Sequence, residues 1–166
     1  MTDTDDFDHW VAAHWTRLVR TAVLLGCAPS RAEDVVQDAL LRCLTKWRHV
    51  QRADNREAYV HRILVNAVAT AHRPRKFRLV PTADTPDGHR PDDTHDVDTR
   101  DAIRRALAAL PHDQCQAVVL RHYAHLTEAQ MAMVLGVSSG TVKSRLSRAM
   151  KALRVDPHLS DLGGTR

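Results

Sequence analysis

The side chains best suited to chemistry gather in residues 126–151, where basic and hydroxyl groups recur at helical spacing. Thr127 and Gln130 form a capping-box pattern, which predicts the start of a helix. Gly136 stands where a helix typically ends in a left-handed residue. The residues expected to pack inward from this first helix are Ala129, Ala132 and Met133, with Leu135 nearby. A second helix after the turn would complete a helix-turn-helix, which binds phosphates and base edges without a catalytic residue.

The second helix of this segment has two distinct faces. Ser138 or Ser139 can cap its start. Its expected buried stripe is Val142, Leu146, Ala149 and Leu153. Its opposite face carries Lys143, Ser144, Ser147, Arg148 and Lys151, whose side chains can reach phosphates and base edges in the major groove. An ordinary amphipathic helical hairpin with a solvated basic face shows the same pattern, so the segment alone leaves that alternative open.

The overall composition favours a helical protein. The chain has 166 residues, enough for one domain or two small ones. Aromatic residues make up 4% and there are only 6 glycines, which is poor material for sheets. The formal net charge is +4, so the arrangement of charge is more informative than its total.

That charge is arranged in blocks. Residues 1–41 hold 3 basic and 7 acidic side chains, a net −4, and residues 42–80 hold 10 and 2, a net +8. Residues 81–102 hold 2 and 7, a net −5, and residues 103–155 hold 8 and 2, a net +6. Two basic blocks separated by an acidic stretch predict two DNA-facing units joined by a linker that avoids DNA.

Helical periodicity predicts the elements that position the first basic block. Residues 7–26 form one helix, and Ser30 with Glu33 forms a second capping box that opens a helix to about Arg48. The expected inward residues of these two helices are Trp10, Val11, Trp15, Leu18, Val19 and Ala22, then Val36, Leu40, Cys43, Leu44 and Trp47. A third helix follows, opened by Asp54 and Glu57 and ending near His72, ahead of Pro74.

A linker and a second set of helices follow. Residues 80–97 contain three prolines, one glycine and little apolar content, which predicts an extended or disordered linker. A helix restarts from Asp98 and breaks at Leu110–Pro111. A further helix over about residues 113–123 leads into the helix-turn-helix.

Other classes of site find little support in the sequence. Cys27, Cys43 and Cys115 are far apart and odd in number, which is typical of buried thiols in a reducing compartment. The 11 histidines include no His-Glu-x-x-His or Cys/His cluster, so no metal site or cofactor is expected. No nucleophile elbow or Gly-rich phosphate loop is present, so we expect no enzyme. The start is acidic and the longest apolar run, 22–28, is too short to span a membrane, so we expect a cytoplasmic protein.

Six segments, in a fixed order, carry a resemblance to a known family. They are Ala32-Glu-Asp-Val-Val-Gln-Asp-Ala-Leu40, Lys46-Trp47-Arg48, Ala58-Tyr-Val-His-Arg-Ile-Leu-Val-Asn66, Leu107-Ala-Ala-Leu-Pro111, Ala117-Val-Val-Leu-Arg121 and Gly140-Thr-Val-Lys-Ser-Arg-Leu-Ser-Arg-Ala149. They span roughly residues 7–153, and the ordered set is far more specific than any one of them. The chain resembles the extracytoplasmic-function (ECF) sigma factors, promoter-specificity subunits of bacterial RNA polymerase, and is most similar to the actinobacterial SigE-like group.

The resemblance implies an all-α fold of two small helical domains. Sigma region 2, a helical bundle, would occupy residues 1–79, and sigma region 4, with the helix-turn-helix, residues 99–155. A flexible acidic linker, 80–98, would join them, and residues 156–166 would form a tail. In the family, the linker runs through polymerase channels otherwise used by RNA. The composition fits a simple flexible tether equally well.

The resemblance also implies roles for residues of region 2. Asp34, Gln37 and Asp38 match the helix that docks on the β′ clamp helices of core polymerase, although solvated residues on a surface helix would look the same. The basic block matches the part that reads and melts the −10 element, holding the melted non-template strand. Its expected DNA contacts are Arg48, Arg52, Asn55, Arg56, Tyr59, Arg62, Asn66, Arg73, Arg75 and Lys76. For Trp47, core packing is favoured over base stacking because the residue falls on the apolar stripe.

In region 4 the resemblance implies contacts with the −35 element of double-stranded promoter DNA. The expected residues are Ser139, Thr141, Lys143, Ser144, Arg145, Ser147 and Arg148. Among them, Arg145 is expected to contact phosphates or polymerase rather than base edges. Further expected partners are the β flap of core polymerase and an anti-sigma factor, which the sequence does not identify. No direct membrane insertion is expected.

Two other functions fit parts of the sequence. A stand-alone regulator would bind a palindromic operator as a dimer, but it needs neither the acidic and amide patch nor the basic strand-binding block. An interaction module would sequester polymerase or an anti-sigma factor without reading DNA, and the basic face of the second helix argues against it. The sigma-factor hypothesis, in which the chain binds core polymerase and directs promoter-specific initiation, accounts for both halves.

Overall fold

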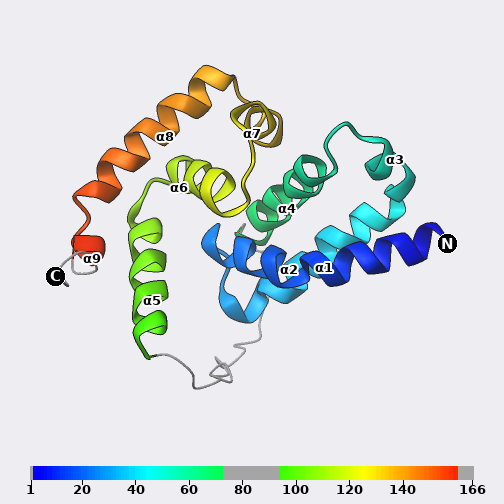
Figure 1. Cartoon of the computed structure of the whole chain (residues 1–166), viewed down its shortest axis with the longest axis horizontal. Helices are drawn as coiled ribbons and strands as arrows, with labels where there is room; N and C mark the ends of the chain where they lie inside the picture. The colour runs from blue at the N-terminus through cyan, green and yellow to red at the C-terminus, as the bar shows by residue number, and fades with distance from the viewer. Residues whose placement is uncertain (1, 73–93, 161–166) are drawn as a thin grey trace.

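The computed structural model describes residues 2–72 and 94–160, and in these residues every regular element is a helix (Figure 1). The elements of the first half are α1 (Asp3–Leu24), α2 (Pro29–Thr45), α3 (Trp47–Arg52) and α4 (Arg56–His72). Those of the second half are α5 (Thr94–Ala109), α6 (His112–Val118), the π-helical turn η1 (Val119–Tyr123), α7 (Glu128–Leu135), α8 (Ser139–Arg154) and α9 (Pro157–Ser160). The predicted all-α fold class is confirmed.

Helix starts in the first half differ from the sequence prediction. Helix α1 begins four residues early, because Thr2 and Asp5 form a capping box with both reciprocal hydrogen bonds. The predicted capping box at Ser30 is wrong. Helix α2 instead starts with Pro29 at its first position, where the ring fixes a helical φ and the missing N–H is not needed.

The second and third predicted helices also change at their ends. The second was expected to reach Arg48, but α2 ends at Thr45 and α3 is a separate short helix. The third is capped by the Asn55 side chain, which accepts from the Ala58 N–H at 2.9 Å, rather than by Asp54.

The second half keeps its predicted breaks but not all of its buried faces. Pro111 separates α5 from α6 as predicted. Helix α5 begins at Thr94 rather than Asp98, and the rest of the predicted linker, 80–93, lies outside the described residues. In α7 the buried residues are Met131 and Val134, and the predicted Ala129 and Met133 are exposed. This helix is apolar on all sides, so periodicity alone does not fix its buried face.

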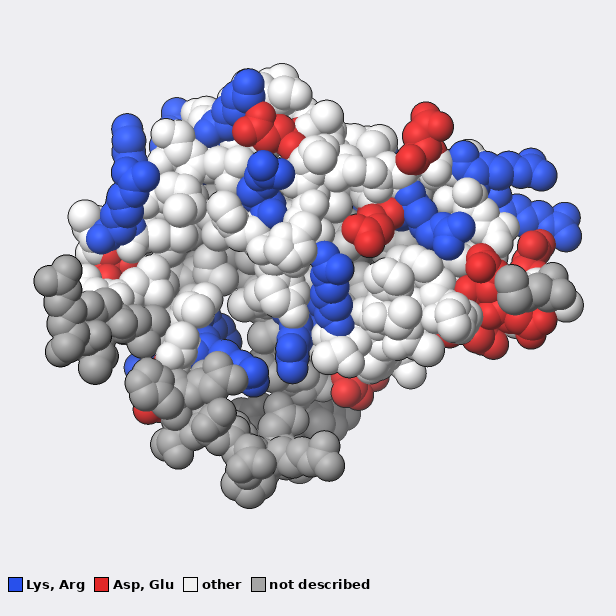
Figure 2. All heavy atoms as spheres, viewed as in Figure 1, with Lys and Arg blue, Asp and Glu red and all other residues white. Residues whose placement is uncertain are grey.

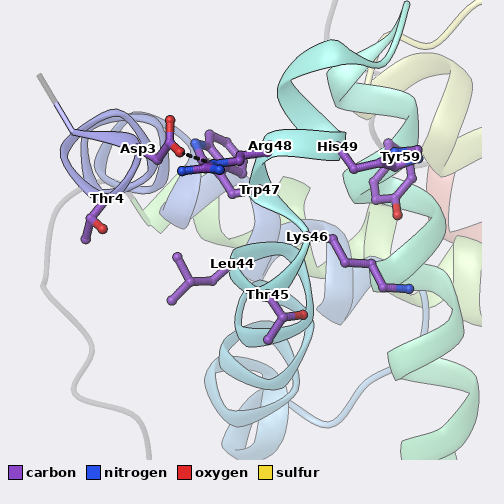
Figure 3. A pocket seen from close by; sticks show the side chains of 9 residues that line it. All are labelled: Asp3, Thr4, Leu44, Thr45, Lys46, Trp47, Arg48, His49 and Tyr59. Atoms are coloured by element: carbon purple, nitrogen blue, oxygen red, sulfur yellow. Dashed lines mark hydrogen bonds and ion pairs between the residues drawn. The ribbon is translucent and has the colours of Figure 1, made fainter.

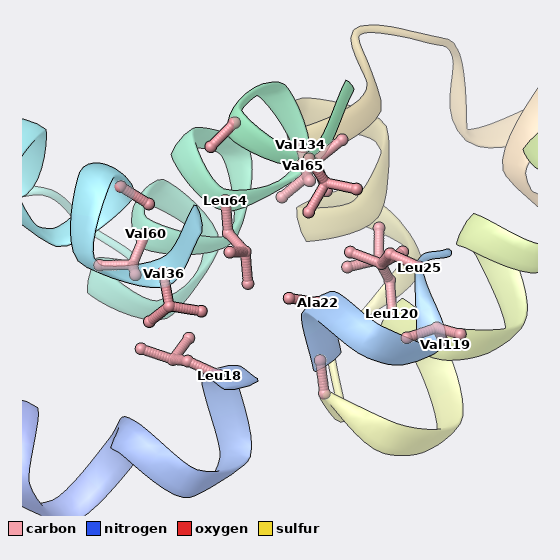
Figure 4. Close-up of a cluster of buried hydrophobic side chains, with 14 of the residues drawn as sticks. Leu18, Ala22, Leu25, Val36, Val60, Leu64, Val65, Val119, Leu120 and Val134 are labelled. Atoms are coloured by element: carbon pink, nitrogen blue, oxygen red, sulfur yellow. The ribbon is translucent and has the colours of Figure 1, made fainter. Parts of the chain in front are cut away.

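One hydrophobic core runs through both halves (Figure 4). In the first half Leu18, Val36 and Val60 pack together from α1, α2 and α4. Helix α4 also lies against α7, where Val65 and Val134 are close neighbours. Leu25, just after α1, meets Leu120 of η1 in the same way. The two helical units are therefore packed on one another in this structure.

Two polar contacts join the halves beside this core. The Arg17 guanidinium of α1 donates to the carbonyl oxygen of Ala124 at 3.1 Å. The Cys115 thiol of α6 donates to the carbonyl oxygen of Leu24 at 3.3 Å. Both acceptors stand at the ends of helical segments, where carbonyl groups lack a partner within the helix.

Candidate nucleic-acid and partner interfaces

The helix-turn-helix is built by local caps. The Thr127 backbone N–H donates to the Gln130 side chain at 2.8 Å, and the Gln130 N–H donates to the Thr127 hydroxyl at 3.2 Å. Gly136 ends α7 with φ +66°, the left-handed conformation that glycine adopts without a Cβ penalty. The Ser138 hydroxyl then accepts from the Thr141 N–H at 3.2 Å and starts α8. The three predictions for the caps and the turn of this motif are confirmed.

Helix α8 presents an exposed polar row opposite its buried stripe. Val142 and Ala149 are buried, and Leu146 and Leu153 pack against the core as predicted. The exposed residues opposite are Ser139, Lys143, Ser147, Arg148 and Lys151, with Ser144 half-buried beside them. Basic side chains gather along the edge of the molecule that α8 forms (Figure 2). This is the charge distribution that a duplex backbone requires.

Two of the residues predicted to contact the −35 element, Thr141 and Arg145, interact with other residues of the protein. Arg145 is 22% exposed and pairs with Asp113 of α6 at 3.3 Å, so the structure separates it from the exposed row. The Thr141 hydroxyl is hydrogen-bonded to Ser138 at 3.0 Å. Lys143 stays exposed, with Glu128 of α7 at 3.8 Å from its ammonium group. Long-range pairing of this kind has no signature in the sequence.

In the first half, an open pocket of about 660 Å³ lies where α1, α2, α3 and α4 meet (Figure 3). Its lining residues are Asp3, Thr4, Leu44, Thr45, Lys46, Trp47, Arg48, His49 and Tyr59. The Tyr59 ring is half-buried and meets His49 edge-on, with ring centroids 5.7 Å apart. Cationic and aromatic groups in one open hollow can hold a phosphate and the face of an unstacked base.

The predicted −10 contacts divide into exposed and structural residues. Arg48, Arg52, Arg62 and Asn66 are exposed on α3 and α4. Asn55 caps α4, as described above, and Arg56 lies over the Trp47 ring at 5.3 Å. The remaining three, Arg73, Arg75 and Lys76, lie outside the described residues.

Trp47 is a core residue, as the sequence favoured. It is buried, Phe7 meets it edge-on at 4.9 Å, and its indole N–H donates to Asp6 at 3.2 Å. A buried indole whose N–H is satisfied stabilises the junction of α1 and α3 and is not free to stack on a base.

The exposed face of α2 combines acidic, amide and apolar side chains. Asp34, Gln37 and Asp38 are all exposed, as predicted. Leu41, one turn further on, is 60% exposed, and Leu44 is also exposed although the sequence placed it in the buried stripe. The spacing 34, 37, 38, 41 marks one helical face, so the sequence itself carries a signal that Leu41 shares the face of the polar residues. Exposed leucines among carboxylates are typical of a protein-binding surface.

The buried titratable groups do not form a reactive site. Burial raises the pKa of the Cys43 thiol to about 11, and it also raises the pKa of Cys27 and Cys115, so all three remain inert thiols. Burial lowers the pKa of His61, whose Nδ1 donates to the Glu57 carbonyl at 2.8 Å. In the described residues no group of three or more His, Cys, Asp or Glu could hold a metal ion. The described helices also include none that is long and apolar enough to cross a membrane.

Comparison with known proteins identifies both units. Residues 10–78 match the family model "Sigma-70 region 2", and residues 100–153 match "Sigma-70, region 4". The RNA polymerase sigma-E factor of Streptomyces avermitilis is 34% identical over 157 residues, which cover 95% of this chain and 88% of the relative. The chain belongs to the extracytoplasmic-function sigma factors.

Two further likenesses agree with this membership. The ECF RNA polymerase sigma factor SigL of Mycobacterium tuberculosis is 34% identical over 168 residues, covering 96% of this sigma factor and 90% of the relative. The sigma factor RpoE, solved in complex with the anti-sigma factor NepR from Bartonella quintana, matches with a TM-score of 0.69 and 27% identity. That match covers 91% of this chain and 98% of RpoE.

The matched ranges assign the surfaces to the two sigma regions. The α2 face and the basic surface of α3 and α4 belong to region 2, and the exposed row of α8 belongs to region 4. Both ranges fall inside the predicted domains 1–79 and 99–155, whose outer boundaries stay predictions. In this sigma factor both candidate DNA-binding surfaces and the candidate polymerase-binding face are accessible.

Proposed function

We propose that this chain binds core RNA polymerase and directs promoter-specific initiation, recognising −10 and −35 elements and assisting promoter melting. One observation carries this proposal: the chain holds both sigma regions in order, and each presents its predicted contact face to solvent. The polymerase would carry out RNA synthesis, and the sigma factor would direct it to the promoter. It would thus act as a specificity subunit rather than as an enzyme.

The α2 face is the proposed docking surface for the β′ clamp helices. Asp34 and Asp38 supply charge, and an amide lies between them at Gln37. Carboxylates at helical spacing suit pairing with guanidinium groups of a partner helix. Leu41 adds an exposed apolar side chain, and its burial on binding would supply the hydrophobic contribution that charge pairs alone lack.

The basic surface of α3 and α4 is the proposed site for the −10 element. Arg48, Arg52 and Arg62 can contact phosphates of the melted non-template strand, with Asn66 one turn beyond Arg62. The pocket beside Tyr59 is placed to receive an unstacked base. Holding one strand in its single-stranded form stabilises the melted state, which is how a protein without a motor assists melting.

Helix α8 is the proposed reader of the −35 element. Ser139 and Thr141 stand at its N-terminus, the end that meets base edges in other helix-turn-helix proteins. Arg148 is exposed further along the same helix. Region 4 would also contact the β flap of polymerase. Because Arg145 is tied to α6, its part in this proposal is to fix the orientation of α8.

Binding both promoter elements at once requires the two halves to separate. The element names place them about 25 base pairs apart, which is roughly 85 Å at about 3.4 Å per base pair. A compact chain of this length has a radius of gyration of about 15 Å, so it spans only roughly 40 Å. The packing of α4 on α7 would therefore be released on the polymerase. A relative of this fold was solved with an anti-sigma factor, which supports such a factor as the partner of the packed form.

Reconstitution with sigma-free bacterial core polymerase tests this proposal. We expect complex formation and discrete transcripts from fragmented genomic DNA, whose start sites reveal the promoter. Asp34→Ala with Gln37→Ala should abolish complex formation, and Arg148→Ala should abolish transcripts only. Arg105→Ala is the matched control because it removes an exposed cation from α5, a helix that carries none of the proposed contact residues. Tight binding to a palindromic duplex without polymerase binding would refute the proposal.

A further inference from the structure

The first turn of α1 is strongly acidic and lies against the proposed −10 surface. Asp3, Asp5, Asp6 and Asp8 fall within its first six residues. The Thr2 N–H and hydroxyl donate to Asp5 at 2.9 and 2.8 Å, so the helix stays regular up to its start. Carboxylates gather at this end of the molecule, beside the basic side chains near α3 (Figure 2).

Asp6 fixes this turn to α3. Its carboxylate accepts from the Gln51 amide at 2.7 Å and from the Trp47 indole at 3.2 Å. The hydrogen bond from Gln51, with smaller contributions from Trp47 and Arg56, lowers the pKa of Asp6. The carboxylate is therefore ionised at neutral pH, and the start of α1 is held in place over α3.

Asp3 forms an ion pair with Arg48, a residue proposed above to contact DNA. Its carboxylate accepts from the Arg48 guanidinium at 2.7 Å, as Figure 3 shows at the rim of the pocket. The side chains are 49% and 81% exposed, so solvent screens the pair and a phosphate can replace the carboxylate. Asp3 occupies the same guanidinium group that a strand phosphate would bind.

Building on the proposed function, we propose that the acidic first turn of α1 is an autoinhibitory contact, in which Asp3 competes with strand phosphate for Arg48. Release of Asp3 by DNA would be an exchange of one anion for another, with Asp6 keeping the helix docked. Because the pair is exposed, its removal should tighten strand binding only about 1.5- to 5-fold at low salt. The inhibition would weaken as salt rises, along with strand binding itself.

The test measures binding of the full chain to a fluorescein-labelled oligothymidylate of about 16 nucleotides by anisotropy, at about 50 and about 200 mM NaCl. The variants are Asp3→Asn, Arg48→Ala, and each of the two aspartate changes, Asp3→Asn and Asp8→Asn, made in the Arg48→Ala background. Asp8→Asn is the matched control, since it makes the same change of charge on the same helix. It lies about 140° around the helix from Asp3, at about 100° per residue, and is exposed.

We expect Asp3→Asn to tighten binding more than Asp8→Asn at low salt, with less difference at high salt. In the Arg48→Ala background the two aspartate changes should have equal effects, because the competition is gone. Equal effects in the native background, or an Asp3→Asn gain that persists without Arg48, would overturn the competition. Unchanged strand binding by Arg48→Ala alone would instead overturn the proposed role of Arg48. Circular dichroism of each variant checks that α1 remains helical.

Discussion

Val65 tests whether packing of the two halves controls the availability of this sigma factor. Val65 lies on α4 against Val134 of α7 and is buried in the packed form. Val65→Ala removes two methyl groups from this contact. At about 0.8 kcal/mol per buried carbon the packed form loses about 1.6 kcal/mol relative to the separated form, and a cavity would add to this. Since about 1.4 kcal/mol is tenfold, the separated fraction should rise about 15-fold.

The assay is affinity for core polymerase together with hydrogen exchange. If both sigma regions must reach polymerase at once, the apparent dissociation constant is inversely proportional to the separated fraction. We expect Val65→Ala to bind core polymerase up to about 15-fold more tightly. Amides of α4 and α7 should exchange faster at the same time.

Val36→Ala is the matched control for this prediction. Val36 is buried with Leu18 and Val60 inside the first half, so the same change should lower global stability without freeing α4 from α7. The reasoning is refuted if Val65→Ala and Val36→Ala bind polymerase equally and show the same exchange pattern.

Three further predictions concern single residues. Gly136→Ala should lower stability by about 1–2 kcal/mol because φ is +66°, whereas Gly140→Ala, within α8, should be neutral or stabilising; urea unfolding compares them. The folded pKa of His61 is lowered by burial, so its contribution to stability is full above about pH 6.5 and is lost as pH falls towards the folded pKa. The free energy of unfolding then changes with pH by at most about 1.4 kcal/mol per pH unit because of His61. In urea titrations, His61→Leu should reduce the loss of stability between about pH 7.5 and about pH 5. Leu41→Ser should weaken polymerase binding about 5- to 10-fold with little change in melting temperature, while Val155→Ser, at a residue even more exposed than Leu41, should leave binding unchanged.

The helix-turn-helix was the part best predicted from the sequence. Its caps involve residues three positions apart, Thr127 with Gln130 and Ser138 with Thr141, and Gly136 fixes the turn by its own conformational freedom. Such features depend only on residues a few positions apart, so a single sequence is enough to predict them. The buried stripe of α8 was equally accessible because its apolar residues occupy a single face.

Features that depend on distant residues were missed. The packing of Val65 on Val134 joins residues far apart in the chain, and both positions look like ordinary core positions of their own helices. The pairing of Arg145 with Asp113 likewise shows only once α6 and α8 are side by side. Leu44 differs from its prediction for another reason: helical periodicity predicts burial for any apolar residue on the stripe, although a partner-binding face also places apolar residues in solvent.

The intramolecular ion pairs bear on how this sigma factor would distinguish its promoter from other DNA. Arg48 is held by Asp3 and Lys143 stands near Glu128, one pair in each half. A phosphate that binds either cation must first replace a carboxylate, so the net electrostatic gain is smaller than for a free cation. Any duplex supplies phosphates, but only the promoter supplies base contacts as well. A weaker contribution from the phosphate contacts, which all DNA shares, would increase the relative weight of the base contacts. The acidic partners would therefore favour specificity over total affinity.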